Sequence, residues 1–320
     1  MYLKVLEFHQ LKEDLDHGDF YQTKAGEALE NDVLAYLSSR PVRFIVLAGC
    51  VGAGKTTFLN RLIQKMDSSG EYLVALMNHN DASKITESMV TEKLLRVIGE
   101  GAKKYKDGES KYEAIIEKIG SHPQRIVLMI DDAQNLKPKT LTVLKKITEK
   151  GISIVLSAHT QFAKKIERSM YEEVGLRLES FEVPGIIGSV RNYLEFLLEK
   201  SGGNIGIFSE EAIDDLSRLC HTPLQVRKMA WAALKKAVIN KEKQVSDKTI
   251  HEILPIDFTH LWVELRRLGY TANEIAEEIM EDKKRVIQCL YGRLPEDDDL
   301  YKTLGVFLHG LGLKIASNEG

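Results

Sequence analysis

The chain has 320 residues, 43% of them hydrophobic and 28% charged, which is the composition of an ordinary globular protein long enough for two or three domains. Its formal net charge of -3 excludes a strong overall attraction to nucleic acid, so any such binding has to come from local basic patches. Three widely spaced cysteines exclude a disulfide framework or a CxxC zinc site, and no apolar run is long enough for a signal peptide or a membrane span. We therefore expect a cytoplasmic protein without a membrane anchor.

Residues 1–40 read as an N-terminal segment of short amphipathic pieces that ends in a predicted helix. Residues 43–48 are a continuous apolar run, followed by a glycine-rich turn and the helical sequence FLNRLIQKM. Three similar apolar runs, separated by helical stretches, follow at residues 72–78, 125–130 and 152–157. This alternation predicts an α/β core with a parallel sheet, which we assign to residues 41–183.

Beyond Pro184 the pattern becomes helical. Residues 184–255 contain three amphipathic stretches with charged outer faces, which predict a helical lid. Residues 256–320 predict a small C-terminal helical domain that closes with a short tail of alternating glycine and apolar residues. Within it, Thr271 and Asp282 can begin two successive helices, a pattern that resembles a helix-turn-helix.

A glycine-rich sequence directly follows the first predicted strand. It fits the pattern GxxxxGK[ST] and leads into a helix, which is the context that a phosphate-binding loop requires. In such a loop the backbone N–H groups face the phosphates, Lys55 reaches the β and γ oxygens, and Thr56 holds magnesium. The sequence therefore predicts ATP and Mg²⁺ as ligands. The predicted nucleotide-binding residues of the loop are Gly49, Cys50, Val51, Gly52, Ala53, Gly54, Lys55, Thr56 and Thr57.

Two aspartates follow the predicted strand at residues 125–130. A phosphate-binding loop needs a partner carboxylate at the end of a neighbouring strand, and Asp131 meets this requirement. It would hold magnesium through water, beside Thr56. Asp132 can orient or deprotonate the attacking water, a role that calls for a carboxylate within hydrogen-bonding reach. A pair of solvated acids at a strand end is the alternative.

Other polar residues are candidates for sensing the γ-phosphate or for neutralising its charge. His159 and Thr160 follow the strand at residues 152–157, where strand ends line the ligand crevice, and Ser157 is the weaker alternative. Arg177, or else Arg168, lies in the interval from which ring-forming ATPases supply an arginine to the adjacent subunit. Arg227 can reach the nucleotide from the helical lid. Each of these side chains can also be an ordinary surface residue.

The order of these motifs resembles an AAA+ ATPase. The sequences LMIDDAQNL and VLSAHTQF, followed by LRLESFEVPGIIGSVRNYLEFLL and TPLQVRKMAWAALKKAV, narrow the resemblance to the GspA/ExeA-like branch and the related TniB, TnsC and MuB type of transposition target-selection ATPases. It covers roughly residues 15–255. The resemblance implies an ATP hydrolase that forms a homo-oligomer, either a ring or a filament. It assigns Lys55 and Thr56 to the Walker A motif, Asp131 to Walker B, and Arg177 to the arginine that precedes the lid.

Some positions depart from this pattern. Asp132 stands where the family usually has glutamate, which implies slow hydrolysis. The sequence TPLQVRKM stands where the family usually has glycine, proline and arginine in succession. The resemblance therefore does not identify the residue that acts as the second nucleotide sensor. Phe20 and Tyr21 lie where such proteins cradle adenine, with ordinary packing as the alternative.

The secretion branch carries membrane and peptidoglycan-binding segments that are not found in this sequence, so the resemblance favours the nucleic-acid branch. It implies a regulator that oligomerises on duplex DNA and signals to a partner such as a transposase. A secretion or envelope-assembly ATPase of the GspA/ExeA type and a STAND-like nucleotide switch remain alternatives.

Basic residues that could contact DNA occur in three places, although residues 256–320 contain eight Lys and Arg against twelve Asp and Glu and so lack a strong basic footprint. The three clusters, each of which can also be a solvated face, are Lys283, Lys284 and Arg285; Lys103, Lys104 and Lys106; and Lys137, Lys139, Lys145 and Lys146.

Overall fold

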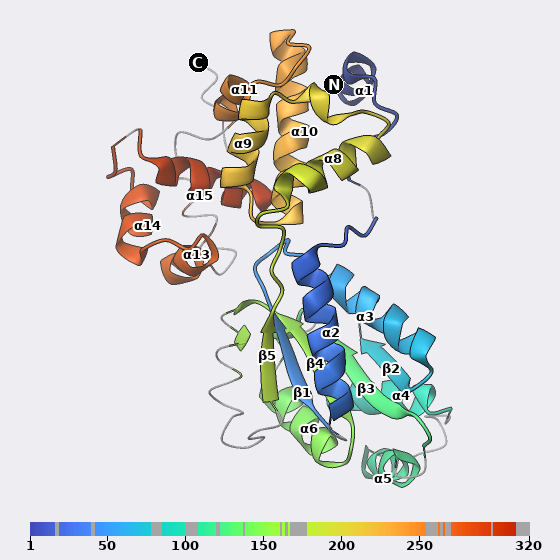
Figure 1. The fold of residues 1–320 in the computed structure, drawn as a ribbon. Coiled ribbons are helices and arrows are strands. Elements are labelled where there is room, and N and C mark those ends of the chain that lie inside the picture. The colour runs from blue at the N-terminus through green and yellow to red at the C-terminus, as the bar shows by residue number, and fades with distance from the viewer. Residues whose placement is uncertain are drawn as a thin grey trace. The chain divides into compact units, whose positions relative to one another are not determined.

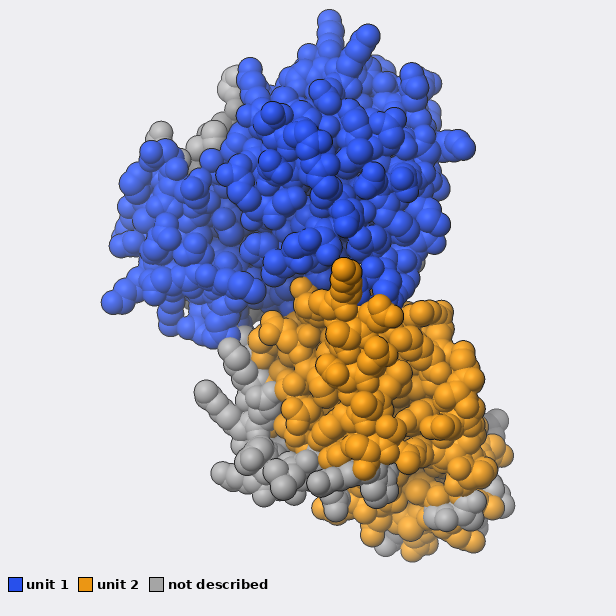
Figure 2. Space-filling model, viewed as in Figure 1, with its two compact units in different colours: residues 1–23, 50–53, 185–320 blue, residues 24–49, 54–184 orange. Residues whose placement is uncertain are grey.

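The protein folds into two compact units (Figure 2). The computed structural model describes residues 1–16, 19–39, 42–77, 85–99, 108–119, 122–136, 138–160, 162–163, 166, 178–253, 262, 265, 270–295 and 297–311. Unit 1 comprises Met1–Thr23, Cys50–Ala53 and Gly185–Gly320, and unit 2 comprises Lys24–Gly49 and Gly54–Pro184.

Unit 2 is built on a parallel sheet of five strands with the order β2-β3-β4-β1-β5 (Figure 1). The residues of β1, β3 and β4 are buried almost throughout, which is why these strands read as continuous apolar runs in the sequence. The parallel sheet predicted from the sequence is confirmed. The strands are β1 (Phe44–Ala48), β2 (Tyr72–Met77), β3 (Arg125–Ile130), β4 (Ser153–Ala158) and β5 (Leu178–Glu182).

The fifth strand is missing from the sequence prediction, which has only four. Leu178 is its one buried residue, while Glu179 and Glu182 are exposed. β5 is an edge strand that pairs only with β1 in the sheet, so it needs no continuous apolar run and leaves a weak signal in the sequence.

Helices wrap this sheet through apolar stripes. In the helix that follows the glycine-rich turn, for example, Phe58, Leu62 and Met66 recur at helical spacing and are all buried. The helices of unit 2 are α2 (Lys24–Ser39), α3 (Lys55–Ser69), α4 (Glu87–Val97), α5 (Gly108–Ile119) and α6 (Pro138–Glu149), with a short 3₁₀ turn, η3 (Ala133–Asn135).

In the described part of unit 1 the regular secondary structure is helical, apart from one isolated β-bridge. Its larger hydrophobic cluster joins α1, α8, α9, α10 and α11, and a second cluster joins α13, α14 and α15. The helices are α1 (Tyr2–His9), α8 (Val190–Lys200), α9 (Glu210–Leu219), α10 (Pro223–Asn240), α11 (Asp247–Glu252), α13 (Ala272–Glu278), α14 (Lys283–Leu290) and α15 (Asp299–Gly310), with the 3₁₀ turn η5 (Ile205–Ile207). Within the described ranges, no helix is both long enough and apolar enough to cross a lipid bilayer.

The two helices of the helix-turn-helix pattern begin at the predicted residues. Thr271 and Glu274 form a capping box at the start of α13, in which each side chain accepts a hydrogen bond from the other's backbone N–H. The Asp282 side chain accepts from the backbone N–H of Lys284 at 2.9 Å and caps α14. The predicted helical C-terminal region is therefore confirmed.

Residues 299–310 form a further helix of this C-terminal region, α15, which the sequence showed only as a tail of alternating glycine and apolar residues. Leu300, Leu304 and Leu308 are buried at a spacing of four residues. Asp298, in the acidic sequence PEDDD at residues 295–299, accepts from the Leu300 N–H at 2.9 Å as the helix N-cap. Two glycines inside the helix obscured this periodicity in the sequence.

Candidate functional site

Parallel strands bring the residues that follow β1, β3 and β4 to one edge of the sheet. β4 lies between the other two strands, with Ala48 opposite Ala158 and Ile130 opposite Leu156. The Gly49 N–H donates to the Ala158 carbonyl at 3.2 Å. The start of the glycine-rich turn and the segments after β3 and β4 are therefore neighbours, as the sequence predicts for a phosphate site.

The glycine-rich turn has the backbone conformation that its glycines permit. Gly52 and Gly54 have φ values of 79° and 95°, in the left-handed region that residues with a Cβ atom rarely adopt. The Ala53 N–H donates to the Cys50 carbonyl at 3.3 Å and closes the turn. Within unit 1, a Cβ atom on Gly52 would also overlap the side chain of Leu224, so both strain and space require glycine at this position.

The first turn of α3 has no side-chain cap. Its N-cap residue is Gly54, which has no side chain to accept from the N–H groups of the first turn. Those N–H groups and the helix dipole favour an anion at this end of the helix. The local geometry fits a nucleotide phosphate.

Lys55 begins α3 and is only 8% exposed. Its ammonium group donates to the Gly49 carbonyl at 2.9 Å, so the charge is held across the glycine-rich turn. A buried ammonium is costly unless it is paired, and a phosphate oxygen would supply the opposite charge. Lys55 is therefore placed to bind the β and γ phosphate oxygens.

Asp131 follows β3, is 8% exposed, and has both carboxylate oxygens engaged. The Thr56 hydroxyl donates to Oδ2 at 2.5 Å, and the Asp132 N–H donates to Oδ1 at 3.1 Å. The hydroxyl of Ser157, on β4, also donates to Oδ1. Four residues from three parts of the chain, all of them candidates from the sequence, thus form one hydrogen-bonded cluster.

The chemistry of this cluster fits magnesium. Mg²⁺ prefers oxygen ligands and is usually held by only one or two protein groups together with water and substrate phosphate. Thr56 Oγ1 and Asp131 Oδ2 are such a pair, and they already lie 2.5 Å apart. Among the described residues there is no group of three or more His, Cys, Asp or Glu that could hold a metal without a phosphate. When bound, magnesium would neutralise phosphate charge there.

Asp132 presents an exposed carboxylate from a left-handed backbone, with φ 52° and ψ 40°. Besides Asp131 Oδ1, its N–H reaches the Ser157 hydroxyl oxygen at 3.3 Å, and its Oδ1 accepts from the Gln134 side-chain amide at 3.3 Å. The carboxylate is open to water beside the metal ligand, which is the arrangement that a general base needs.

The remaining predicted residues are placed as follows. His159 comes directly after β4, at the same sheet edge, and is half-buried. Arg168 and Arg177 lie outside the described residues. In unit 1, Arg227 on α10 donates to Asp16 at 2.6 Å. Its role as a nucleotide sensor stays a prediction.

Tyr21, one of the two candidates for cradling adenine, packs within unit 1. Its ring lies 5.3 Å from the rings of both Tyr193 and Phe196. Packing against these two rings is a sufficient reason for an aromatic residue at position 21, and it is the alternative that the sequence left open.

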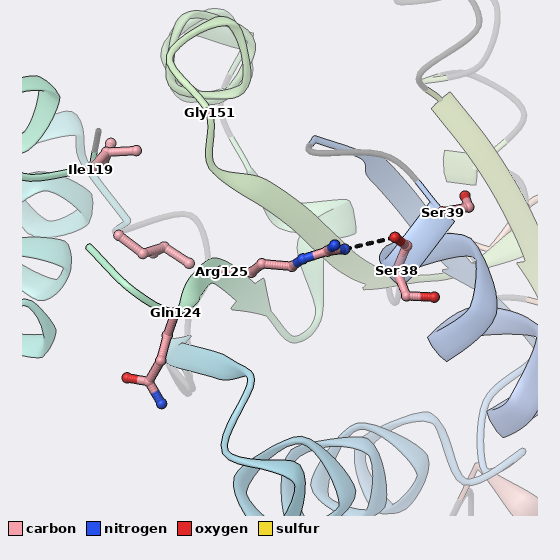
Figure 3. Close-up of a pocket in the computed structure, with 7 residues that line it drawn as sticks. Ser38, Ser39, Ile119, Gln124, Arg125 and Gly151 are labelled. Atoms are coloured by element: carbon pink, nitrogen blue, oxygen red, sulfur yellow. Dashed lines mark hydrogen bonds between the residues drawn. The ribbon is translucent and has the colours of Figure 1, made fainter. Parts of the chain in front are cut away.

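A pocket of about 330 Å³ lies at the opposite, amino-terminal end of β3 and β4 (Figure 3). Arg125 extends toward the end of α2, where it donates to the carbonyls of Leu37 and Ser38 at 3.2 and 2.7 Å. The guanidinium group is therefore engaged in capping α2, and its charge balances the negative end of that helix dipole. We therefore assign the pocket to the contact between Arg125 and the end of α2, and not to the phosphate site.

Comparison with known proteins agrees with this geometry. Residues 39–166 match the family model of the AAA domain, AAA_22. Residues 39–166 therefore carry an AAA domain. The predicted AAA+ P-loop fold, the ATP hydrolase class and the use of ATP and Mg²⁺ are confirmed. Of the narrower resemblance, the link to GspA has a counterpart among the relatives below, and the TniB, TnsC and MuB branch stays a prediction.

A curated relative is the general secretion pathway protein A of Aeromonas hydrophila. It is 24% identical over 215 residues, which cover 62% of this chain and 37% of that protein. The matched part is thus well under half of the relative's length.

Solved structures share the fold along nearly the whole chain. The ORC2 protein of Aeropyrum pernix, in ADPNP-ADP complexes, is similar over 95% of this chain and 91% of its own, with 15% identity and a TM-score of 0.55. Cdc6p from Pyrobaculum aerophilum is similar over 95% of this chain and 90% of its own, with 15% identity and a TM-score of 0.54. Drosophila ORC bound to DNA is similar over 98% of this chain and 80% of its own, with 13% identity and a TM-score of 0.53.

Proposed function

We propose that this protein is a cytoplasmic ATP-dependent regulator that binds duplex DNA, assembles with ATP into a homo-oligomer and signals to a partner protein such as a transposase. The observation that carries the DNA-binding part is the capped helix pair α13–α14, whose second helix begins with exposed lysines. In DNA-binding helix-turn-helix proteins the second helix enters the major groove. The likeness in fold to Drosophila ORC bound to DNA supports this proposal.

The charge on α14 favours contact with phosphates over reading of bases. Lys283, Lys284 and Gln288 are exposed, whereas Arg285 is paired with Asp298 at 3.0 Å and with Glu281 at 3.2 Å. Two lysines therefore remain as the main positive groups on this helix. Phosphate contacts position a protein on DNA without selecting a sequence, so we expect binding with little sequence preference.

In the ATPase site, Lys55 would bind the β and γ phosphate oxygens, Thr56 and Asp131 would hold magnesium, and Asp132 would activate the attacking water. We further propose that His159 senses the γ-phosphate. Arg177, supplied by a neighbouring subunit, and Arg227, supplied by the lid, would neutralise charge on the transferred phosphoryl group.

The basic residues on α6 are a second candidate surface for DNA. Lys139 and Lys146 are exposed on this helix. Lys103, Lys104, Lys106 and Lys137 lie outside the described residues. In an assembled ring or filament, such lysines would follow the phosphate backbone by charge alone.

The double substitution Lys283→Ala and Lys284→Ala tests the DNA interface. We expect weaker binding to every duplex sequence, because phosphate contacts are sequence-independent, and a slope of log affinity against log salt that is shallower by about 2. Fluorescence anisotropy with nonspecific duplex DNA and ATP at several salt concentrations gives this slope. ATP turnover without DNA should not change.

The matched control removes two exposed lysines from another part of unit 1, in the double substitution Lys243→Ala and Lys248→Ala. This control should retain the slope of the unmodified protein. Equal slopes for both double variants would contradict DNA binding through α14.

A second candidate function is a secretion or envelope-assembly ATPase. The relative from Aeromonas hydrophila favours it, because that relative is a general secretion pathway protein. A protein of this kind would hydrolyse ATP at the same rate with and without DNA and would not bind duplex DNA. The STAND-like switch would instead retain nucleotide without turnover.

A further inference from the structure

We propose that Ser157 is a positioning residue, whose single buried hydroxyl orients both the magnesium ligand Asp131 and the water-activating Asp132. This inference rests on the roles proposed above for the two aspartates. The sequence suggested Ser157 only as an alternative sensor of the γ-phosphate, and its observed contacts point elsewhere.

The Ser157 hydroxyl is fully buried and bridges two consecutive residues of the neighbouring strand end. It donates to Asp131 Oδ1, and its oxygen accepts from the Asp132 N–H at 3.3 Å. The register explains this reach, because Ile130 on β3 pairs with Leu156 on β4 and the next residue on each strand is Asp131 and Ser157. Its place in β4, between β1 and β3, holds the hydroxyl at this point.

Ser157 first determines which carboxylate oxygen of Asp131 faces Thr56. Asp131 Oδ1 receives two donors, the Ser157 hydroxyl and the Asp132 N–H, so the carboxylate is fixed with Oδ2 toward Thr56. The metal ligand is thereby presented in one orientation. Removing a group that hydrogen-bonds to a metal ligand, without touching the metal, typically lowers metal affinity roughly 10- to 100-fold.

Ser157 also contacts the backbone of Asp132. Asp132 has a positive φ of 52°, which is uncommon for a residue with a side chain, and Ser157 accepts the N–H of this strained residue. The hydroxyl therefore helps to hold the turn from which the Asp132 carboxylate projects. Ser157 touches neither metal nor nucleotide in this role, so it positions other groups and takes no part in the chemistry itself.

The test is the magnesium dependence of ATP binding in the full chain, measured by equilibrium titration. For Ser157→Ala we expect the magnesium concentration at half-maximal effect to rise roughly 10- to 100-fold. Affinity for ATP in EDTA should be unchanged, because the phosphate-binding turn is intact. Ser157→Cys, which replaces the hydroxyl with a thiol that donates more weakly, should shift the midpoint in the same direction. It replaces the alanine variant if that variant does not fold.

Ser153→Ala is the matched control, because Ser153 is a buried serine at the other end of the same strand. Its hydroxyl accepts from the Arg43 N–H at 3.1 Å, away from the candidate site. A magnesium midpoint for Ser157→Ala that equals the Ser153→Ala value would overturn the inference, provided that Asp131→Asn shifts the midpoint. An unchanged midpoint in Asp131→Asn would overturn the magnesium assignment itself, and the inference with it.

Discussion

Replacing Lys55 with alanine should lower both ATP affinity and ATP turnover by roughly 100-fold, since a charge-assisted hydrogen bond in a buried site is worth up to about 3 kcal/mol and each tenfold corresponds to about 1.4 kcal/mol. Lys55 is 8% exposed and spans the glycine-rich turn to the Gly49 carbonyl, so its ammonium group is held where the phosphates would lie. Calorimetric titration with ATP and a steady-state hydrolysis assay measure the two effects.

Lys150→Ala is a suitable control, because Lys150 is an exposed lysine of the same unit and its loss should change neither quantity. Melting temperatures of both variants would separate a loss of binding from a loss of folding. Turnover in Lys55→Ala within a few-fold of the unmodified protein would contradict the assignment of this loop to phosphate binding.

Asp132→Asn should reduce turnover by roughly 100- to 10,000-fold, the usual contribution of a general base, while the affinity for ATP with magnesium changes little. An amide cannot accept the proton of the attacking water. It still fits the left-handed backbone at φ 52°, because asparagine is among the residues that tolerate this region best. The substitution therefore removes the chemistry with little disturbance of the turn. Single-turnover hydrolysis and equilibrium binding of ATP separate the two quantities.

Asp67→Asn, at an exposed position on α3, controls for the loss of one negative charge in the same unit. It should leave turnover unchanged. If Asp132→Asn instead lost ATP affinity and turnover in parallel, Asp132 would be a nucleotide-binding or metal-binding residue and not the base.

The sequence alone predicted the core of the site because the signals there are local. The phosphate-binding loop is a spacing of glycines with Lys55 and Thr56, and Asp131 is the first polar residue after a buried strand. Parallel pairing of β1, β4 and β3 is then enough to bring the carboxyl ends of these strands together. The confirmed starts of α13 and α14 are equally local, since a capping residue acts within its own first turn.

The parts that could not be predicted depend on distant partners. The bond from Ser157 to Asp131 follows from the register of β3 on β4, which joins residues 26 positions apart. Arg227 pairs with Asp16, which is 211 positions away, so the sequence around Arg227 gave no sign of this contact. The edge strand β5 has too few buried residues to produce a hydrophobic pattern that predicts a strand.

The most direct test of the proposed function is ATP turnover by the intact chain, with magnesium, in the presence and absence of nonspecific duplex DNA. We predict turnover that requires magnesium and rises when DNA is added, together with larger ATP-dependent assemblies in sedimentation. Turnover that is indifferent to DNA, with no DNA-dependent assembly, would contradict the proposed regulator and favour the secretion ATPase, and an absence of turnover would contradict the hydrolase assignment itself.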